Sequence, residues 1–191
     1  GRSDRFRPDR SLTQANRRHN YPPAMALFPI RHFGDPVLRM PASVVKDIDT
    51  GVRKLVTDMI ETMYAAPGVG LAAPQIGVSR AVIVFDAQDD EGARVLINPD
   101  LVESDGEYEY EEGCLSVPGH YWPITRPGYV RVRGLDIDGK TIEYFGEGLL
   151  GRVLQHEIDH LRGILLIERL EKKVRKQALK TLREEALGLE A

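Results

Sequence analysis

The stretch LQHEIDHLRG, residues 154–163, constrains this chain more than any other. Its two histidines are four residues apart, so on a helix they lie on one face, one turn from each other. Both imidazoles can then reach one metal ion, and Glu157 lies close enough to reach a water on that metal. A divalent metal lowers the pKa of a bound water to roughly 7, and a glutamate can take the proton. The pattern predicts a hydrolytic metal centre on His156, Glu157 and His160.

The alternative is that these are two histidines on an ordinary surface helix. Apolar side chains occupy most sides of the same helix, at Leu149, Leu150, Val153, Leu154, Ile158 and Leu161. Such a helix is mostly buried. Buried imidazoles and carboxylates are costly unless they are paired or bound to a metal. The metal site is therefore the favoured interpretation, and Gly163 is the expected end of the helix.

A two-histidine site needs a third protein ligand, and the residues offer two kinds. Glu168 and Glu171 are the nearest downstream acids, as in many metalloproteases, and no histidine follows His160. Cys114, the single cysteine, lies upstream in EGCLSVPG, where turn residues could bring it to the helix. A thiolate is a good ligand for Zn(II) or Fe(II). Buried packing is the alternative role for a lone cysteine.

The order of the remaining elements predicts an α+β fold. Helical spacing over 47–66, with Asp49 or Thr50 as cap, precedes the Gly-rich apolar loop 68–79. Strands are expected at 81–86 and 94–102, then an acidic, turn-rich segment at 106–119. Alternation over 129–148 predicts a hairpin with a two-residue turn at Asp138-Gly139. The HExxH helix and a charge-rich last helix at 168–187 complete the chain.

The composition sets the class of protein and its surroundings. The 191 residues fit one domain, which we place at 25–191, after an arginine-rich segment, 1–24, expected to be a flexible extension. A net charge of −3 gives no general attraction to DNA or to an anionic membrane. No apolar run approaches the ~20 residues of a membrane span. One cysteine excludes an intrachain disulfide, which suits a reducing cytoplasm.

Three stretches together resemble the signature motifs of the peptide deformylase family, in the order of that family. They are GVGLAAPQIG (68–77), EGCLS (112–116) and QHEIDH (155–160). The start MALFPIRHFGDPVLR (25–39) is also similar to the family's N-terminus, which favours Met25 as the natural initiator. The segment GHYWPITRP (119–127) is more aromatic than the family pattern, so the resemblance does not say which residues rim the cleft beyond methionine.

The resemblance implies a site and a reaction. Cys114, His156 and His160 would hold one divalent metal, with Fe(II) expected and Zn(II), Ni(II) or Co(II) as alternatives. Glu157 would act as general base and then as acid toward the leaving amine. An activated water would attack the N-formyl group on the initiator methionine of a new peptide and release formate. The side-chain amide of Gln75 and the backbone N–H of Leu115 would stabilise the oxyanion.

The same resemblance implies how substrate is bound. The implied substrate-binding residues are Gly68, Val69, Gly70, Gly113, Leu149 and Val153. The peptide would dock as an added strand beside Val69, where the glycines allow close backbone approach. Leu149 and Val153 are candidates for the methionine pocket, with core packing as the alternative. Glu112 is expected to pair with Arg126.

The fold implied by the resemblance has small mixed or antiparallel sheets around a central HExxH helix, with one N-terminal and one C-terminal helix. The last helix is basic, at Lys172, Lys173, Arg175, Lys176, Lys180 and Arg183. A contact with the ribosome through it is one expectation, and a solvated charged face is the other. The protein is expected to be a cytoplasmic monomer. The competing functions are a zinc endopeptidase with a downstream third ligand and a non-catalytic homologue that binds formyl-peptides or ribosomes.

Overall fold

A five-stranded antiparallel sheet, in the order β1-β2-β3-β6-β7, forms the centre of the computed structural model, which describes residues 27–188. Its strands are β1 (Gly70–Ala72), β2 (Val82–Phe85), β3 (Arg94–Asp105), β6 (Tyr129–Leu135) and β7 (Thr141–Glu147). A separate hairpin pairs β4 (Tyr108–Cys114) with β5 (Val117–Arg126). The helices are α1 (Thr50–Ala65), α2 (Gly148–Leu161) and α3 (Lys172–Ala186), and three 3-10 turns are η1 (Pro36–Arg39), η2 (Ala73–Ile76) and η3 (Leu166–Arg169). The predicted extension at 1–24 and Met25 lie outside the described residues.

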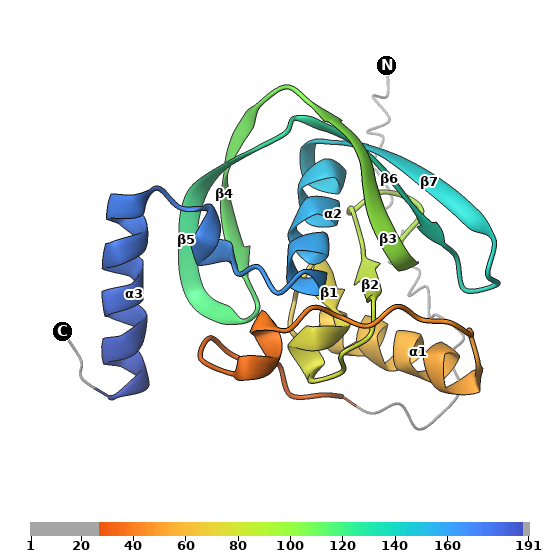
Figure 1. Cartoon of the computed structure of the whole chain (residues 1–191), viewed down its shortest axis with the longest axis horizontal. Coiled ribbons are helices and arrows are strands. Elements are labelled where there is room, and N and C mark those ends of the chain that lie inside the picture. Colours follow the sequence, from red (N-terminus) through yellow and green to blue (C-terminus); the bar gives the residue numbers. More distant parts are fainter. Residues whose placement is uncertain (1–26, 189–191) are drawn as a thin grey trace, which may run out of the picture.

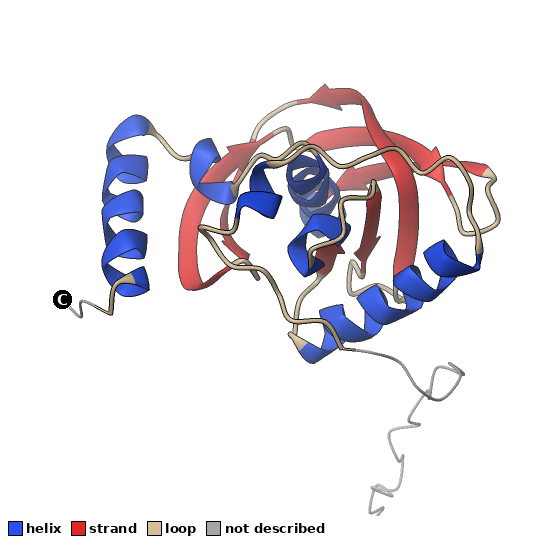
Figure 2. Cartoon of the chain, turned by 60° about the horizontal axis from the view of Figure 1, so that its bottom comes forward, coloured by secondary structure: helices blue, strands red, loops and turns tan. Residues whose placement is uncertain are grey.

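The two faces of the sheet are covered by different helices. Along β2, Val82 and Val84 pack in the cluster that contains α1, whereas Ile83 and Phe85 pack in the cluster that contains α2. Successive strand residues point to opposite faces, so VIVF must be apolar throughout. The HExxH helix is therefore a core element, buried from 151 to 161. In Figures 1 and 2 the strands curve around α2.

The β4–β5 hairpin brings the cysteine segment to α2. After β3, the chain turns at Gly106, whose φ of +68° suits glycine, and enters β4. The tight turn after Cys114 returns the chain along β5, on the opposite side of α2 from β2 in Figure 1. The acidic first part of segment 106–119 is therefore a strand that the sequence did not predict, whereas the expected turn follows it at residues 115–116.

Three further boundaries differ from the sequence prediction. Residues 68–79 are not only a loop, since they contain β1 and η2, both buried. The connection between β6 and β7 spans residues 136–140 rather than two residues, because the Asp136 side chain accepts hydrogen bonds from two backbone N–H groups inside it. The last helix begins at Lys172 rather than 168, since η3 buries Leu166 and Ile167 before it.

Other sequence predictions are confirmed. Asp49 caps α1, accepting from the Val52 N–H at 2.8 Å, and α2 ends shortly before Gly163, at a φ of +72°. The class is α+β with antiparallel sheets around α2, as expected.

The third core cluster joins α3, through Ala178 and Leu182, to η3 and β5. Within residues 27–188, none of the helices has the length and apolar character needed to cross a bilayer.

Candidate active site

The HExxH residues lie on the buried length of α2. The Nε2 atoms of His156 and His160 are 3.2 Å apart, so both imidazoles converge on one point, as their spacing predicts. His156, Glu157 and His160 are 8%, 3% and 1% exposed, respectively. Polar groups buried this deeply need partners or a ligand.

Cys114 comes to the same point from the end of β4. Its Sγ atom lies 3.2 Å from His160 Nε2, and the donor atoms of Cys114, His156 and His160 all lie within 4.8 Å of one another. Of the two acidic alternatives, Glu168 is otherwise engaged, since its carboxylate accepts from the Leu165 N–H and from Arg39, and Glu171 is exposed at the start of α3. Within the described part of the chain, Cys114 is therefore the third candidate ligand.

The spacing of this donor set fits a divalent metal. Tetrahedral coordination with metal–sulfur distances near 2.3 Å and metal–nitrogen distances near 2.0 Å places ligand atoms about 3.3–3.6 Å apart. The two separations of 3.2 Å are close to this range. The other ring nitrogen of His156, Nδ1, lies 2.6 Å from Glu112 Oε1, which leaves the Nε2 lone pair directed at the site.

The ionisation of Cys114 also suits a metal ligand. Burial opposes the charged form, but the imidazoles of His160 and His156 together hold the pKa of the Cys114 thiol well below its ordinary value. The thiolate is the form that binds metals. Cys114 can therefore supply the thiolate that a metal ligand requires.

Glu157 lies beside the donor set without belonging to it. Burial raises the pKa of Glu157 to about 7, although the neighbouring imidazoles act in the opposite direction. Its Oε2 atom is buried and has no hydrogen-bond partner among the described residues. A Cβ added at Gly70 would overlap the Glu157 carboxylate, so β1 approaches α2 here because residue 70 is glycine. Such a carboxylate can exchange a proton with a molecule in the site near neutral pH.

Gln75, at the end of η2, presents its amide to the same site. It is 1% exposed, and its Oε1 accepts from the Ala72 N–H at 2.9 Å. This contact turns the NH₂ group toward Ser116 Oγ, at 3.1 Å, and Cys114 Sγ, at 3.7 Å. Gln75 is thus a fixed hydrogen-bond donor rather than a solvated loop residue.

A cleft opens above these groups, between the β1 segment, the hairpin and α2. The expected substrate-binding residues Gly68, Val69, Gly70, Gly113, Leu149 and Val153 all line it, as do Leu115, Gln75 and Glu157. Val153 is 5% exposed and packs in the core beside α2, as the core-packing alternative predicted, while also lining the cleft. Leu149 is 37% exposed.

The aromatic segment on β5 forms part of the rim. Tyr121 lines the cleft, and its ring covers Gly113 so closely that a Cβ there would meet Tyr121 Cδ1 at 2.8 Å. Trp122 points the other way, stacking on His120 with ring centroids 5.5 Å apart and packing in the cluster that contains α3. Opposite-facing neighbours are expected along a strand.

Glu112 connects the candidate ligands to a buried ionic network that the sequence reasoning found only in part. The expected Glu112–Arg126 pair is present, at 2.7 Å and 2.9 Å. Arg152 also donates to Glu112, at 2.5 Å, and it was not identified from the sequence. The signal that could have found it is its position four residues before His156, on the same helix face.

The network predicts a pH dependence of stability. Burial alone would raise the pKa of Glu112, but hydrogen bonds from Arg126 and His156 lower it well below its usual range. A carboxyl group with a lowered pKa stabilises the fold above its unfolded pKa of about 4.3 and loses this contribution as the pH falls. We expect the free energy of unfolding of the metal-free protein to decrease as the pH falls from about 5 to 3.

Glu112→Gln tests the source of this dependence. The substitution leaves the buried Arg152 guanidinium without its counter-charge and removes one of the two carboxylates paired with Arg126, which costs about 3–5 kcal/mol at pH 7. It should also flatten the dependence between pH 5 and 3, because the titrating group is gone. Urea unfolding at pH 7 and pH 4 measures both. Glu111→Gln, at an exposed position on the same strand, is the matched control, and equal behaviour of the two variants would contradict the assignment.

Comparison with known proteins gives one consistent result. The family model described as polypeptide deformylase matches residues 27–176. The peptide deformylase of Halothermothrix orenii is 49% identical over 146 residues, which are 76% of this chain and 95% of that protein. Peptide deformylase 1 of Burkholderia multivorans is 50% identical over 158 residues, 82% of this chain and 87% of that protein.

Solved structures agree. A peptide deformylase from Legionella pneumophila superposes with a TM-score of 0.79 at 45% identity, covering 87% of this chain and 99% of that one. The enzyme from Thermus thermophilus gives 0.79 at 44% identity, covering 85% and 96%. The family match spans most of the chain, and the expected resemblance is confirmed. This chain belongs to the polypeptide deformylase family.

Proposed function

We propose that this protein is a metal-dependent hydrolase that removes the N-formyl group from the initiator methionine of newly made polypeptides and releases formate. The observation that carries the proposal is the meeting of Cys114 with His156 and His160 at the base of a cleft beside a buried Glu157. This arrangement combines three ligand atoms, a proton acceptor and a site for a peptide. Membership of the deformylase family supports the same reaction.

Cys114, His156 and His160 would hold one divalent cation, and Fe(II) is the ion we propose, with Zn(II), Ni(II) or Co(II) as substitutes. When bound, such a cation supplies an activated water and polarises the formyl carbonyl. Glu157 takes a proton from the attacking water and returns it to the amine that leaves. Its pKa of about 7 is suited to both transfers near neutral pH.

The remaining residues are proposed to stabilise the oxyanion and to orient the substrate. The Gln75 amide and the backbone N–H of Leu115 donate to the formyl oxygen as negative charge develops on it. The substrate backbone lies along Gly68–Gly70 and beside Gly113, and its methionine side chain packs on Leu149 and Val153. The support is that all of these residues line one cleft and that side chains larger than hydrogen would crowd Gly70 and Gly113.

Formate release from a short N-formyl-methionyl peptide tests the function. The protein is prepared without oxygen, loaded with Fe(II), and also assayed on an internally quenched, unformylated peptide. We expect formate and no internal cleavage. Internal cleavage would instead support an HExxH endopeptidase, and binding of the formyl-peptide without formate would support a non-catalytic homologue. Either result would overturn the proposal.

Gln75→Leu provides a sharper test of the oxyanion contact. Removing one preorganised donor should lower kcat by about 10²–10³-fold. Metal content should stay unchanged, because Gln75 is not among the three ligand residues. Steady-state kinetics and metal analysis of the same preparation measure the two effects.

Ser116→Ala is the control for Gln75. It removes the hydroxyl that the Gln75 amide contacts at 3.1 Å but leaves the amide itself in place. Its kcat should therefore remain near that of the parent. A similar loss in both variants would show that the η2 conformation, rather than the donor, sets the rate.

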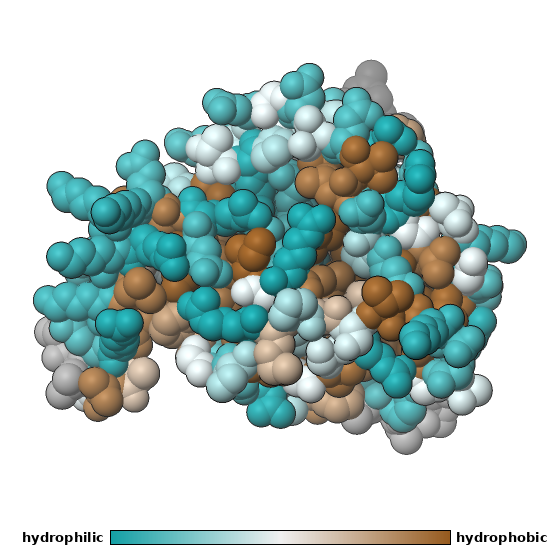
Figure 3. Space-filling view, in the orientation of Figure 1, coloured by the Kyte–Doolittle hydropathy of each residue, from teal (hydrophilic) through white to brown (hydrophobic). Residues whose placement is uncertain are grey.

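We also propose that α3 contacts ribosomal RNA. Lys172, Lys173, Lys176, Lys180 and Arg183 are exposed along it, and Figure 3 shows hydrophilic side chains over this end of the molecule. Lys and Arg bind phosphates with a strong salt dependence. Co-sedimentation with ribosomes at low and high salt, for the parent and for Lys176→Glu/Lys180→Glu, tests it. The contact would be contradicted if ribosome binding were the same at low and high salt, or the same for the parent and the double variant.

The setting of this activity completes the proposal. Residues 25–191 act as one catalytic domain, in the cytoplasm, where formylated chains are made and where Cys114 stays reduced. The protein works as a monomer, which sedimentation of the metal-loaded protein measures directly.

A further inference from the structure

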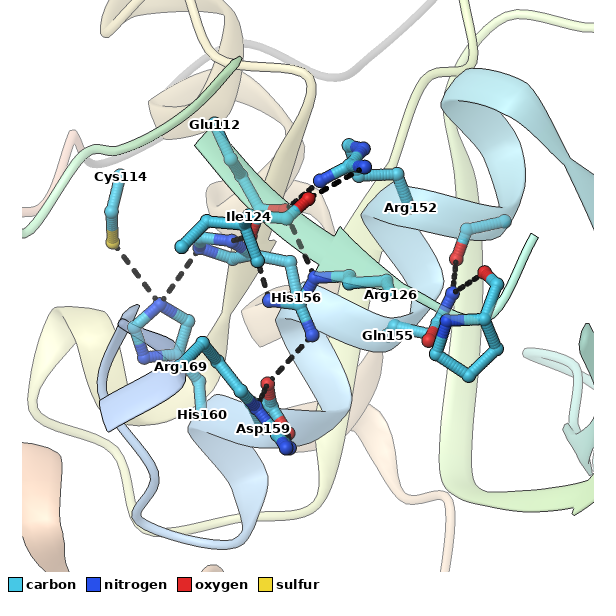
Figure 4. A network of polar contacts seen from close by, with 12 residues as sticks. Glu112, Cys114, Ile124, Arg126, Arg152, Gln155, His156, Asp159, His160 and Arg169 are labelled. Carbon is cyan, nitrogen blue, oxygen red and sulfur yellow. Dashed lines mark hydrogen bonds and ion pairs between the residues drawn. The ribbon is translucent and has the colours of Figure 1, made fainter. Parts of the chain in front are cut away.

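Five charged side chains form a continuous row beside the candidate metal ligands, and Figure 4 shows them from close by. In order they are Arg152, Glu112, Arg126, Asp159 and Arg169, so the charges alternate in sign. The first four residues are 5% or 6% exposed, whereas the Arg169 side chain is 40% exposed. The row touches the metal site at one point, where Glu112 Oε1 meets His156 Nδ1.

Glu112 is held from four directions. Its Oε1 accepts from Arg126 Nη2 at 2.7 Å and faces His156 Nδ1 at 2.6 Å. Its Oε2 accepts from Arg126 Nε at 2.9 Å and from Arg152 Nη1 at 2.5 Å. A carboxylate has about four acceptor sites, so this one is saturated and cannot rotate without breaking a charged hydrogen bond.

Arg152 is itself held by contacts beyond Glu112, although its buried Nε has no hydrogen-bond partner among the described residues. Its Nη2 donates to the backbone carbonyls of Tyr108 and Ile124, at 3.0 Å and 3.2 Å. The rings of Tyr108 and Tyr110 lie over its guanidinium, with centroids 5.3 Å and 5.5 Å away. Arg152 therefore ties α2 to both strands of the hairpin that carries Glu112 and Cys114.

The other end of the row starts from η3. Arg126 Nη1 donates to Asp159 Oδ2 at 2.8 Å, and Arg169 Nε donates to the same oxygen at 2.9 Å. A second, short contact joins Arg169 Nη2 to Asp159 Oδ1. Arg169 thus fixes the Asp159 carboxylate, which accepts from Arg126 Nη1 while Arg126 Nε and Nη2 pair with Glu112.

Helix geometry explains why the row lines up with the ligand. Arg152, His156 and Asp159 are spaced four and three residues apart on α2, so they share one face. Glu112 and Arg126 face them from β4 and β5. The ligand therefore lies between a cation and an anion of its own helix, each paired with the opposite charge on the hairpin.

We propose that Arg152 and Arg169 are positioning residues for the metal ligand His156, acting on it from the two ends of this row. Arg152 fixes the second oxygen of Glu112. Arg169 fixes Asp159, which holds Arg126 Nη1 and so orients that guanidinium for its bidentate pair with Glu112. The outcome is one tautomer and one orientation of the imidazole, with Nδ1–H toward Glu112 and Nε2 toward the metal. This inference rests on the proposed metal ligands.

Metal affinity and the state of the imidazole test the inference without relying on turnover. Loss of a group that supports a metal ligand lowers metal affinity by about 10–100-fold. We expect Arg152→Met to raise the dissociation constant for Zn(II) within this range and Arg169→Gln to raise it less, because Arg169 is half exposed. In the Zn(II)-loaded protein, the His156 Nδ1–H proton signal should shift and exchange faster with solvent in both variants.

Two further variants separate positioning from general stability. Arg162→Gln is the matched control, since Arg162 follows α2 and, within residues 27–188, its ion pair is with the exposed Asp100 at 3.8 Å. Arg152→Lys keeps one charged donor for Glu112 and should recover part of the Zn(II) affinity. If Arg152→Met does not fold, Arg152→Lys and Arg169→Gln still decide the question.

The outcomes are distinguishable. Unchanged Zn(II) affinity and an unchanged Nδ1–H signal in the Arg152 and Arg169 variants, as in Arg162→Gln, would overturn this inference alone. A parent protein that binds neither Zn(II) nor Fe(II) would overturn the proposed function and this inference with it.

Discussion

Glu157→Ala is expected to lower the rate of formate release by about 10²–10⁴-fold, the contribution of a positioned general acid–base group. The metal content should be retained, because the three donor atoms belong to Cys114, His156 and His160. The reason is that Glu157 is the buried carboxylate beside this donor set that could take the proton. Within residues 27–188, it is the only carboxylate with a buried oxygen that has no hydrogen-bond partner. Single-turnover assays with metal analysis measure both quantities.

Glu111→Gln is the control for Glu157. Glu111 is an exposed acid that lines the same cleft, so its replacement tests whether any negative charge near the substrate is sufficient. Its rate should remain close to that of the parent. Retention of most activity by Glu157→Ala would mean that another group manages the proton.

Cys114→Ala should abolish tight metal binding and, with it, activity. A supporting group is worth about 10–100-fold in metal affinity, so loss of a direct ligand should exceed the upper end of that range. Cys114 contributes the only sulfur to the donor set, 3.2 Å from His160 Nε2. In the Co(II)-loaded parent a thiolate-to-metal charge-transfer band is expected, and the variant should lack it.

Cys114→Ala, together with two related variants, tests whether Cys114 or a downstream acid is the third metal ligand. Cys114→Ser keeps the size of the side chain but supplies a weaker ligand, so its affinity should fall between those of parent and Cys114→Ala. Glu168→Gln should bind metal like the parent, because the Glu168 carboxylate is engaged with the Leu165 N–H and Arg39. Spared binding in Cys114→Ala would favour the endopeptidase interpretation.

Much of the fold could be predicted because its signals are local. The helix α1, its Asp49 cap and the end of α2 near Gly163 follow from spacing and end residues. The β4 strand was missed because acidic alternation at Tyr108–Glu111 resembles a solvated loop when its partner strand is unknown. The early start predicted for α3 has a similar cause, since η3 buries Leu166 and Ile167 only against tertiary neighbours.

For the candidate site, local sequence spacing was sufficient to predict the two histidines, but not the third ligand, which comes from a distant part of the chain. The i, i+4 spacing of His156 and His160 requires only a helix, and it was sufficient to predict that their nitrogens converge. Composition and spacing left the third ligand open between Cys114 and the downstream acids. Only family resemblance favoured the cysteine before the structure was known, because Cys114 lies 42 positions before His156 and no local sequence rule predicts where the hairpin between them folds.

The sequence alone therefore determined the α+β class, the helix face that carries both histidines and the family, since each is encoded in residues that are close together in the chain. The tertiary structure decided that the hairpin places Cys114 3.2 Å from His160. It also decided that Arg152 and Arg169 enclose the Glu112–Arg126–Asp159 row. These contacts join β4, β5, α2 and η3. Their strength depends on burial and on distances that exist only once those elements have packed.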